Sequence, residues 1–250
     1  MKKIVLDIET KRSFDEVGGH HNKAKLGISL VGTYHYDADE YIAYREDELD
    51  RLEHDLREAE LLIGFNLIGF DWPVLAASLG DWVYKLPTLD LMFEAQKALG
   101  HRVSLNSMAQ ATLGIGKLGS GLDALEYYKN GDWEKLEKYC LEDVRITKEI
   151  YEYALENGFA YYTQRKGKAK VAMAFSKSPY SELFAKAAKN KGSLKMVYGA
   201  KERQIDVIRF DGVHIRAYCH LRKSVLTFRL DRVESANEIA SSVPLFDLDN

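Results

Sequence analysis

Short apolar runs alternate with amphipathic segments over the first 158 residues of the chain. Runs rich in β-branched and aromatic residues are typical of strands, and they occur at 3–9, 28–36, 41–45, 61–66 and 85–91. Apolar residues spaced three or four positions apart predict helices. These occupy 46–60, 71–79, 104–114, 121–130 and 132–157, and one more helix follows the strand that ends at 91 and runs to 99. Strands that alternate with helices predict an α/β fold, in which helices flank a sheet.

The pattern changes beyond residue 158. A weak alternation predicts a hairpin over 159–175, and 176–179 is the best candidate for a linker. An amphipathic helix and a series of short strands follow, which together predict a small helix-plus-β-barrel domain. The helix is expected over 180–191 and the strands at 193–198, 204–210, 213–220 and 225–230. We therefore expect two domains, residues 1–175 and 176–250.

The composition excludes several classes of protein. With only two cysteines, Cys140 and Cys219, the chain can form neither a four-ligand zinc site nor a disulfide framework, which favours a reducing compartment. The sequence contains no run of about 18 apolar residues, which predicts that no transmembrane helix forms. Asp7 and Glu9 interrupt the apolar start of the sequence, which argues against a signal peptide. We therefore expect a cytoplasmic protein without a membrane partner.

Charge is divided unevenly along the chain. Residues 1–158 hold 18 Lys and Arg against 29 Asp and Glu, a net charge of −11, whereas residues 159–250 hold 17 against 9, a net charge of +8. Acidic residues can hold metal ions, and a basic surface can bind a polyanion. Ordinary solvated surfaces would give the same division, so charge alone does not decide between these interpretations.

Two carboxylates, Asp7 and Glu9, stand at the end of the first predicted strand. Residues two positions apart on a strand point to the same face, so these acids lie side by side. Their repulsion and desolvation need an offset, which a hard divalent cation would provide through oxygen ligands. The alternative is an exposed strand end with two solvated acids.

Two further acids have positions that suggest a ligand. Asp143 lies on the apolar stripe of the longest predicted helix, with Tyr139 one turn earlier on the same side. A carboxylate on a packed face needs a partner, which could be a metal ion, a core arginine or a hydroxyl. Asp71 follows a buried strand and opens a helix, where it could bind a ligand or cap the helix before Pro73. Asn66, just before it, could bind loop backbone.

These acids come from a strand end, a helix start and an inward helix face. In an open α/β sheet such positions can converge beyond the carboxyl ends of the strands, where these folds place ligands. Four converging carboxylates suit a two-metal site with ions roughly 3.5–4 Å apart, which favours in-line displacement at phosphorus. We therefore expect two divalent metal ions, Mg²⁺ or Mn²⁺, as cofactors.

The same residues fall into three motifs, which are Asp7-x-Glu9, Asn66-x-x-x-Phe70-Asp71 and Tyr139-x-x-x-Asp143. In order and spacing these motifs resemble those of the DEDD exonucleases, which have a ribonuclease H-like fold and remove nucleotides from 3′ ends. The tyrosine of the third motif points to the DEDDy branch, and segments 87–91 and 113–117 also look like stretches of this family. The resemblance covers roughly residues 1–158. It implies a mixed sheet flanked by helices and a metal-dependent 3′–5′ exonuclease that acts on single-stranded DNA or RNA.

The resemblance also implies a role for each residue of the motifs. Asp7 would bridge both metal ions, Glu9 and Asp143 would complete the site that activates water, and Asp71 would serve the second ion. Tyr139 would orient the attacking water, because a tyrosine with an ordinary pKa near 10 is a poor free base at neutral pH.

Four other polar or aromatic positions lie within or between these motifs. Asn66 and Phe70 are candidate contacts to the substrate strand, or they hold the turn. Lys117 is a candidate phosphate contact, or an ordinary solvated lysine. Asp90 is expected to cap a helix rather than to bind metal.

The second predicted domain resembles a different family. Segments 194–198, 213–222 and 227–233 resemble the WYL domain, a small bacterial and phage module with an Sm-like or SH3-like barrel that senses ligands or binds nucleic acid. Val213-His214-Ile215 stands where that domain has its Trp-Tyr-Leu tripeptide. The resemblance implies a regulatory ligand or a role in substrate binding.

Within this second domain, three arginines are the candidate anion contacts, because guanidinium forks match phosphate: Arg222, Arg229 and Arg232. A structural pairing of Arg232 with Asp231 or with a neighbouring strand is the alternative. Basic residues that interleave with aromatic ones between 159 and 191 also suit a nucleic-acid backbone, or they form a lysine-rich solvent face. His20 and His21 lie in a predicted loop, and no pattern places them near the acids.

Two other functions stay open at this point. A regulator could bind nucleic acid or a small ligand through the basic domain, with the nuclease fold as a passive scaffold. A ribonuclease H-like endonuclease would differ from an exonuclease because it would still cut a strand with a blocked 3′ end.

Overall fold

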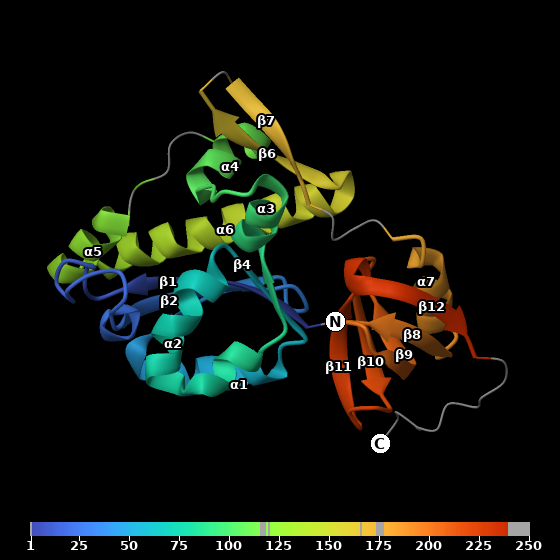
Figure 1. Ribbon diagram of the computed structural model, residues 1–250. Coiled ribbons are helices and arrows are strands. Elements are labelled where there is room, and N and C mark those ends of the chain that lie inside the picture. The colour runs from blue at the N-terminus through green and yellow to red at the C-terminus, as the bar shows by residue number, and fades with distance from the viewer. Residues whose placement is uncertain (1, 116–118, 120, 166, 174–177, 240–250) are drawn as a thin grey trace. The chain divides into compact units, whose positions relative to one another are not determined.

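The computed structural model describes residues 2–115, 119, 121–165, 167–173 and 178–239. The chain divides into two compact units, of which the first comprises Lys2–Ala172 and the second begins at Met173 (Figure 1). Among the described residues, no helix combines the length and the apolar character needed to cross a membrane.

A mixed five-stranded sheet forms the centre of the first unit. Its strand order is β3-β2-β1-β4-β5. The strands are β1 (Lys3–Thr10), β2 (Ile28–His35), β3 (Glu40–Arg45), β4 (Leu61–Gly64) and β5 (Thr88–Asp90). β1, β2 and β3 pair antiparallel, whereas β1, β4 and β5 pair parallel. The parallel strands therefore end at the same edge of the sheet, and the mixed α/β architecture expected from the sequence is confirmed.

Helices cover both faces of this sheet (Figure 1). The α-helices are α1 (Leu49–Glu58), α2 (Trp72–Leu79), α3 (Leu91–Leu99), α4 (Leu105–Leu113), α5 (Gly121–Asn130) and α6 (Trp133–Asn157). Single turns complete the connections: the 3₁₀ helices η1 (Lys23–Lys25), η2 (Glu46–Glu48) and η4 (Asp81–Lys85), and the π-helical turn η3 (Leu67–Asp71). The long helix α6 runs along one face, and α1 and α2 lie on the other.

Strand β1 alternates between these two faces. Ile4, Leu6 and Ile8 are buried in the core that α1 and α2 cover, whereas Asp7 and Glu9 point to the side of α6. On β2, Gly32 lies opposite Asp7, and a Cβ at this position would lie only 2.8 Å from the Sγ of Cys140 on α6. The absent side chain therefore lets α6 pack closely against the strand that carries the first two acids.

The first unit ends in an antiparallel hairpin of β6 (Phe159–Gln164) and β7 (Gly167–Ala172), as the alternation predicted. Hydroxyl groups of α4 bind the other edge of β6. The Thr112 hydroxyl donates to the Tyr161 carbonyl and accepts from the Tyr161 amide, each at 2.9 Å. The Ser107 hydroxyl accepts from the Thr163 amide at 3.0 Å. These side chains satisfy the hydrogen-bonding groups of the β6 backbone that do not pair with β7, and they fix the hairpin on α4.

The second unit contains α7 (Ser181–Lys189) and a five-stranded antiparallel sheet of order β11-β10-β9-β8-β12. Its strands are β8 (Ser193–Tyr198), β9 (Glu202–Phe210), β10 (His214–Cys219), β11 (Ser224–Arg229) and β12 (Val233–Glu238), with η6 (Leu230–Arg232) before the last. Phe184 of α7 is buried against residues of the sheet such as Ile205 and Phe228. The sequence pattern did not predict β12, because Val233 is its single buried residue. The closed barrel stays a prediction.

Candidate metal and catalytic site

The four acids of the sequence motifs lie together in the first unit. Asp7 and Glu9 end β1, Asp71 ends the turn η3 that follows β4, and Asp143 lies in α6. Their electrostatic interaction shows their proximity, since repulsion from Asp71, Asp143 and Glu9 each contributes to raising the pKa of Asp7. The parallel pairing of β1 with β4 brings the ends of these strands to one edge, and the packing of α6 brings Asp143 to the same place.

Burial and repulsion both disfavour negative charge in this cluster. Burial is the main cause that raises the pKa values of Asp7, Glu9 and Asp71 well above the ordinary carboxyl range. Burial, followed by repulsion from Glu142, raises the pKa of Asp143 to about 6. Burial and repulsion therefore favour the protonated carboxyls, and a bound cation would favour the ionised ones.

The carboxylate of Asp71 gives independent evidence that the cluster is built for a ligand. Asp71 is only 2% exposed, and its Oδ1 has no hydrogen-bond partner among the described residues. Its side chain does not cap α2, so the alternative of a helix cap is wrong. A buried carboxylate oxygen without a partner is costly, and a bound cation would remove that cost.

Oxygen donors dominate the site, with one sulfur at its border. The carboxylates of Asp7 and Glu9 and the Sγ of Cys140 provide atoms that all lie within 4.8 Å of one another. The Cys140 thiol donates a 3.7 Å hydrogen bond to the Asp7 carbonyl, and its burial raises its pKa well above the ordinary thiol value. The thiol therefore stays protonated, and the carboxylate oxygens are the donors that suit Mg²⁺ or Mn²⁺.

Tyr139 lies one turn before Asp143 on α6, at the wall of the same cavity. A hydrogen bond with Tyr139 opposes the rise in the pKa of Asp143. Burial, together with repulsion from Asp143 and Glu9, raises the pKa of Tyr139 itself above its ordinary value. The phenol is therefore protonated at neutral pH, and its hydroxyl can donate or orient but cannot act as a free base.

Asp90 holds the turn that carries the second motif. Its carboxylate accepts from the amides of Phe93, at the start of α3, and of Asn66 and Ile68, at 3.2, 2.8 and 3.0 Å. The prediction that Asp90 caps a helix is therefore confirmed, and the same side chain also organises the residues that precede Asp71. Asn66 adopts a left-handed conformation with φ of 72°.

The side chain of Asn66 binds another side chain rather than loop backbone. Its Oδ1 accepts a 2.7 Å hydrogen bond from the guanidinium of Arg102, which lies between α3 and α4. Asn66 and Arg102 line a cavity of about 500 Å³ together with Asp7 and Asp143. One side of the acid cluster therefore carries an arginine that the sequence motifs did not indicate.

A second cavity, of about 510 Å³, lies on the other side of the acids. Its walls include Asp7, Glu9, Tyr139 and Asp143, together with the rings of Phe14, His20 and Phe70. The ring centroids of Phe14 lie 4.0 Å from His20 and 6.0 Å from Phe70. The expectation that nothing places His20 near the acids is therefore wrong: the loop after β1 folds back over the end of its own strand.

Neither Phe14, His20 nor Arg102 could be found from spacing. Each comes from a loop between motifs, and no periodic pattern fixes how such a loop folds over a site. The one available signal was proximity in sequence, since Phe14 and His20 come 5 and 11 residues after Glu9.

The remaining candidate residues are Lys117 and three arginines of the second unit. Lys117 lies outside the residues that the structure describes. In the second unit, Arg222 and Arg232 are exposed, whereas Arg229 is 7% exposed. Its guanidinium makes a two-point ion pair with Asp231, at 2.9 and 2.7 Å. Asp231 thus pairs with Arg229 rather than with Arg232.

Comparison with known proteins relates this geometry to a family. Residues 4–155 match the model of the RNase H superfamily. Among solved structures, the chain is similar to the family B DNA polymerase from the hyperthermophilic archaeon Pyrobaculum calidifontis, with a TM-score of 0.46 and 18% sequence identity. The similar region covers 62% of this chain and 24% of the polymerase, so it spans about a quarter of that protein. The curated proteins include no match to the chain.

Proposed function

The chain belongs to the RNase H superfamily, and from this premise we propose that it is a metal-dependent 3′–5′ exonuclease of the DEDDy type. Its RNase H-like fold supports nuclease activity on nucleic acid. The observation that carries the finer proposal is the convergence of Asp7, Glu9, Asp71 and Asp143 with Tyr139 beside them. The substrate is the 3′ end of a single strand of DNA or RNA.

The donor set fits divalent metal ions. All four carboxylates offer hard oxygen ligands, and the unpartnered Oδ1 of Asp71 is a buried acceptor that a cation would satisfy. Asp7, Glu9, Asp71 and Asp143 would hold two ions, Mg²⁺ or Mn²⁺. When bound, such ions supply a Lewis acid that activates water and compensates charge at the scissile phosphate.

The protein's own groups position the reactants. The protonated Tyr139 hydroxyl, beside Asp143, orients the attacking water along the line of the scissile bond. Asp90 fixes the turn before Asp71 through the backbone amides of Asn66 and Ile68, so the second motif keeps its geometry without a ligand. The site is thus largely arranged before substrate binds.

The cavity beside the acids suits a terminal nucleotide. Phe14 and Phe70 present aromatic rings, and base stacking on such rings tolerates every sequence. Asn66 is proposed to contact the substrate strand indirectly, because its side chain accepts a hydrogen bond from Arg102, whose guanidinium would bind the strand. A pocket that accepts a chain end favours an exonuclease over an endonuclease.

The second unit is proposed to act as a WYL-like module that binds the substrate or a regulatory ligand. Residues 173–250 hold 13 Lys and Arg against 9 Asp and Glu, and this net charge of +4 supports an anionic partner. Arg222 and Arg232 are its exposed candidate contacts. Weaker binding of a labelled oligonucleotide to the full chain with Arg222→Ala and Arg232→Ala is expected. Unchanged affinity would exclude the role in substrate binding and leave the binding of a small regulatory ligand.

Digestion of end-labelled oligonucleotides tests the proposed activity. With Mg²⁺ or Mn²⁺, a 5′-labelled strand is expected to shorten one nucleotide at a time, and a blocked 3′ end is expected to protect it. Asp7→Asn should abolish this activity, whereas Asp50→Asn, an exposed aspartate of α1, should retain it. Internal cleavage of the blocked strand would replace the exonuclease with an endonuclease, and undiminished activity of Asp7→Asn would refute the site.

A further inference from the structure

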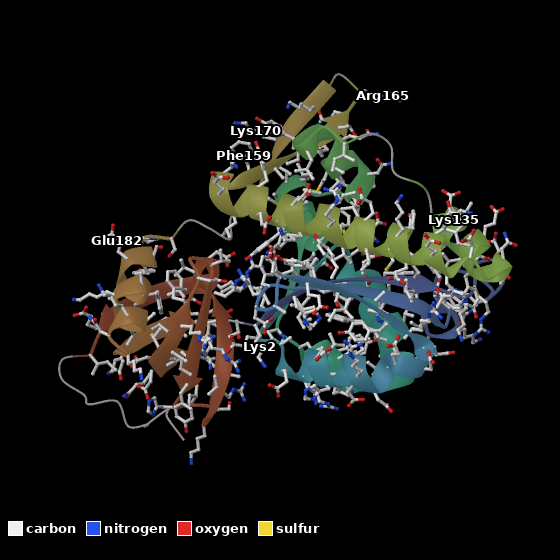
Figure 2. All side chains as sticks on the ribbon, turned by 180° about the vertical axis from the view of Figure 1, so that it is seen from behind. Lys2, Lys135, Phe159, Arg165, Lys170 and Glu182 are labelled. Carbon is white, nitrogen blue, oxygen red and sulfur yellow. The ribbon has the colours of Figure 1, made fainter. Side chains whose placement is uncertain are left out.

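A groove separate from the terminal-nucleotide cavity lies beside the β6–β7 hairpin. It has a volume of about 610 Å³. One wall is the start of α4 and the segment before it, with Arg102, Ser104 and Ser107. The other is the end of β6 and the residue after it, with Thr163 and Arg165. Figure 2 shows Arg165 at the tip of the hairpin.

The walls of this groove are tied to each other. The Ser107 and Thr163 hydroxyls lie 2.7 Å apart, and the Thr163 amide donates to the Ser107 hydroxyl. The ring of His101 packs edge-on against the buried Tyr162, with centroids 6.0 Å apart. The hairpin therefore keeps its position against α4, and the groove exists before any ligand binds.

Arg102 connects this groove to the acid cluster. The cavity that Asp7 and Asp143 line shares Arg102, Val103 and Ser104 with the groove. Since Asn66 holds the Arg102 guanidinium at 2.7 Å, the arginine stands where the two spaces meet. A chain that leaves the acids on this side would pass Arg102 before it reaches the hairpin.

The chemistry of the walls suits a polyanion. Neither residues 100–108 nor residues 159–172 contain an aspartate or glutamate, in contrast to the net charge of −11 over residues 1–158. Arg102 and Arg165 supply guanidinium groups. The Ser104 hydroxyl, and the one of the Ser107 and Thr163 hydroxyls that accepts from the other, can donate hydrogen bonds to phosphate oxygens. The other described hairpin cations point elsewhere, since Lys168 and Lys170 stand over aromatic rings of β6 at 4.4 and 4.0 Å.

We propose that this groove binds the phosphodiester backbone of the single strand on the 5′ side of the scissile bond. Arg102 contacts the backbone at the junction, and Arg165 contacts it further along. The inference rests on the proposed function, since it assigns the remainder of the substrate strand whose 3′ end enters the acid cluster. It makes the hairpin a determinant of affinity for longer substrates.

The test is the salt dependence of oligonucleotide binding, measured with a fluorescein-labelled ten-nucleotide strand in EDTA. For single strands, each phosphate contact contributes about 0.7 to the slope of log affinity against log salt, which corresponds to about fourfold in affinity at about 0.15 M salt. Arg165→Ala is therefore expected to weaken binding about fourfold and to reduce the slope by about 0.7. Arg165→Glu should weaken binding further.

Lys2→Ala is the matched control, because it removes one exposed cation of the same unit. Lys2 pairs with Glu58 at 3.4 Å and lies well apart from Arg165 (Figure 2). The control is expected to keep the wild-type slope and affinity. An unchanged slope in Arg165→Ala, or an equal loss in Lys2→Ala, would overturn the groove assignment.

Binding in EDTA needs no hydrolysis, so the two proposals fail separately. If Arg165→Ala lowers the slope but the wild-type protein releases no nucleotides with Mn²⁺, the groove stands and the exonuclease fails. If the wild-type protein shortens 3′ ends and the slope is unchanged, the exonuclease stands and the groove fails.

Discussion

Neutralising one acid of the cluster should stabilise the metal-free protein. Asp143→Asn replaces a carboxylate by an amide of the same shape and leaves an oxygen to meet Tyr139. In the folded state the pKa of Asp143 is raised from 3.8 to about 6. At about 1.4 kcal/mol for each tenfold, this corresponds to about 3 kcal/mol of destabilisation when the group is ionised.

The sign of the pH dependence follows from the raised pKa. Between about pH 4 and 6 the folded protein keeps a proton that the unfolded chain has released, so the free energy of unfolding falls as pH rises through this window. Above about pH 6 the loss from Asp143 is complete. The raised pKa values of Asp7, Glu9 and Asp71 add to the loss in the same direction.

Thermal unfolding in EDTA, followed by tryptophan fluorescence, measures this effect in the first unit. All three tryptophans lie there, at 72, 82 and 133. In a domain of this size, each kcal/mol of stability shifts the melting temperature by about 2–4 °C. A gain of about 3 kcal/mol should therefore raise the melting temperature of Asp143→Asn above that of wild type by about 6–12 °C at pH 8. At pH 5 the difference should shrink.

Glu149→Gln is the control for this experiment. Glu149 lies on the same helix but pairs with Arg145 near the surface, so its loss should change stability by less than about 1 kcal/mol. If Asp143→Asn melts at or below the wild-type temperature at pH 8, burial and the charge of Glu142 do not disfavour the ionised Asp143 carboxylate as described.

Three further substitutions test other parts of the account. Tyr139→Phe should lower kcat about 100-fold with little change in KM or melting temperature, since it removes the hydroxyl that orients water; a larger effect on KM would contradict this role. Asp90→Ala should lower the free energy of unfolding by about 3 kcal/mol in urea titrations, because three backbone amides lose their acceptor. Gly32→Ala should cost about 1–3 kcal/mol and reduce activity, because its Cβ would meet the Cys140 Sγ at 2.8 Å and push α6 away from β1; wild-type stability and activity would contradict the close packing.

The sequence predicted the part of the fold that rests on periodic burial. The apolar runs at 3–9 and 61–66 became β1 and β4, and the stripe along 132–157 became α6. The position of Asp7 and Glu9 on one strand face followed from the same alternation. β12 was missed because an edge strand that buries only Val233 has no alternation to detect.

The site was predictable where its residues sit on regular elements and not where they sit on loops. Asp143 and Tyr139 are one turn apart on a helix, so their shared face followed from spacing. The turn η3 carries Asp71 inward without capping α2, which local helix-start signals could not show. Arg102 and His20 reach the site through loops, whose course depends on tertiary packing.

We propose that these carboxylates bind metal as one unit. Calorimetric titration of Mn²⁺ into metal-free protein tests it most directly, with wild type and Asp7→Asn compared at the same pH. Wild type is expected to bind two ions per chain saturably, and Asp7→Asn is expected to lose that binding. Equal binding by both proteins, or none by wild type, would contradict it.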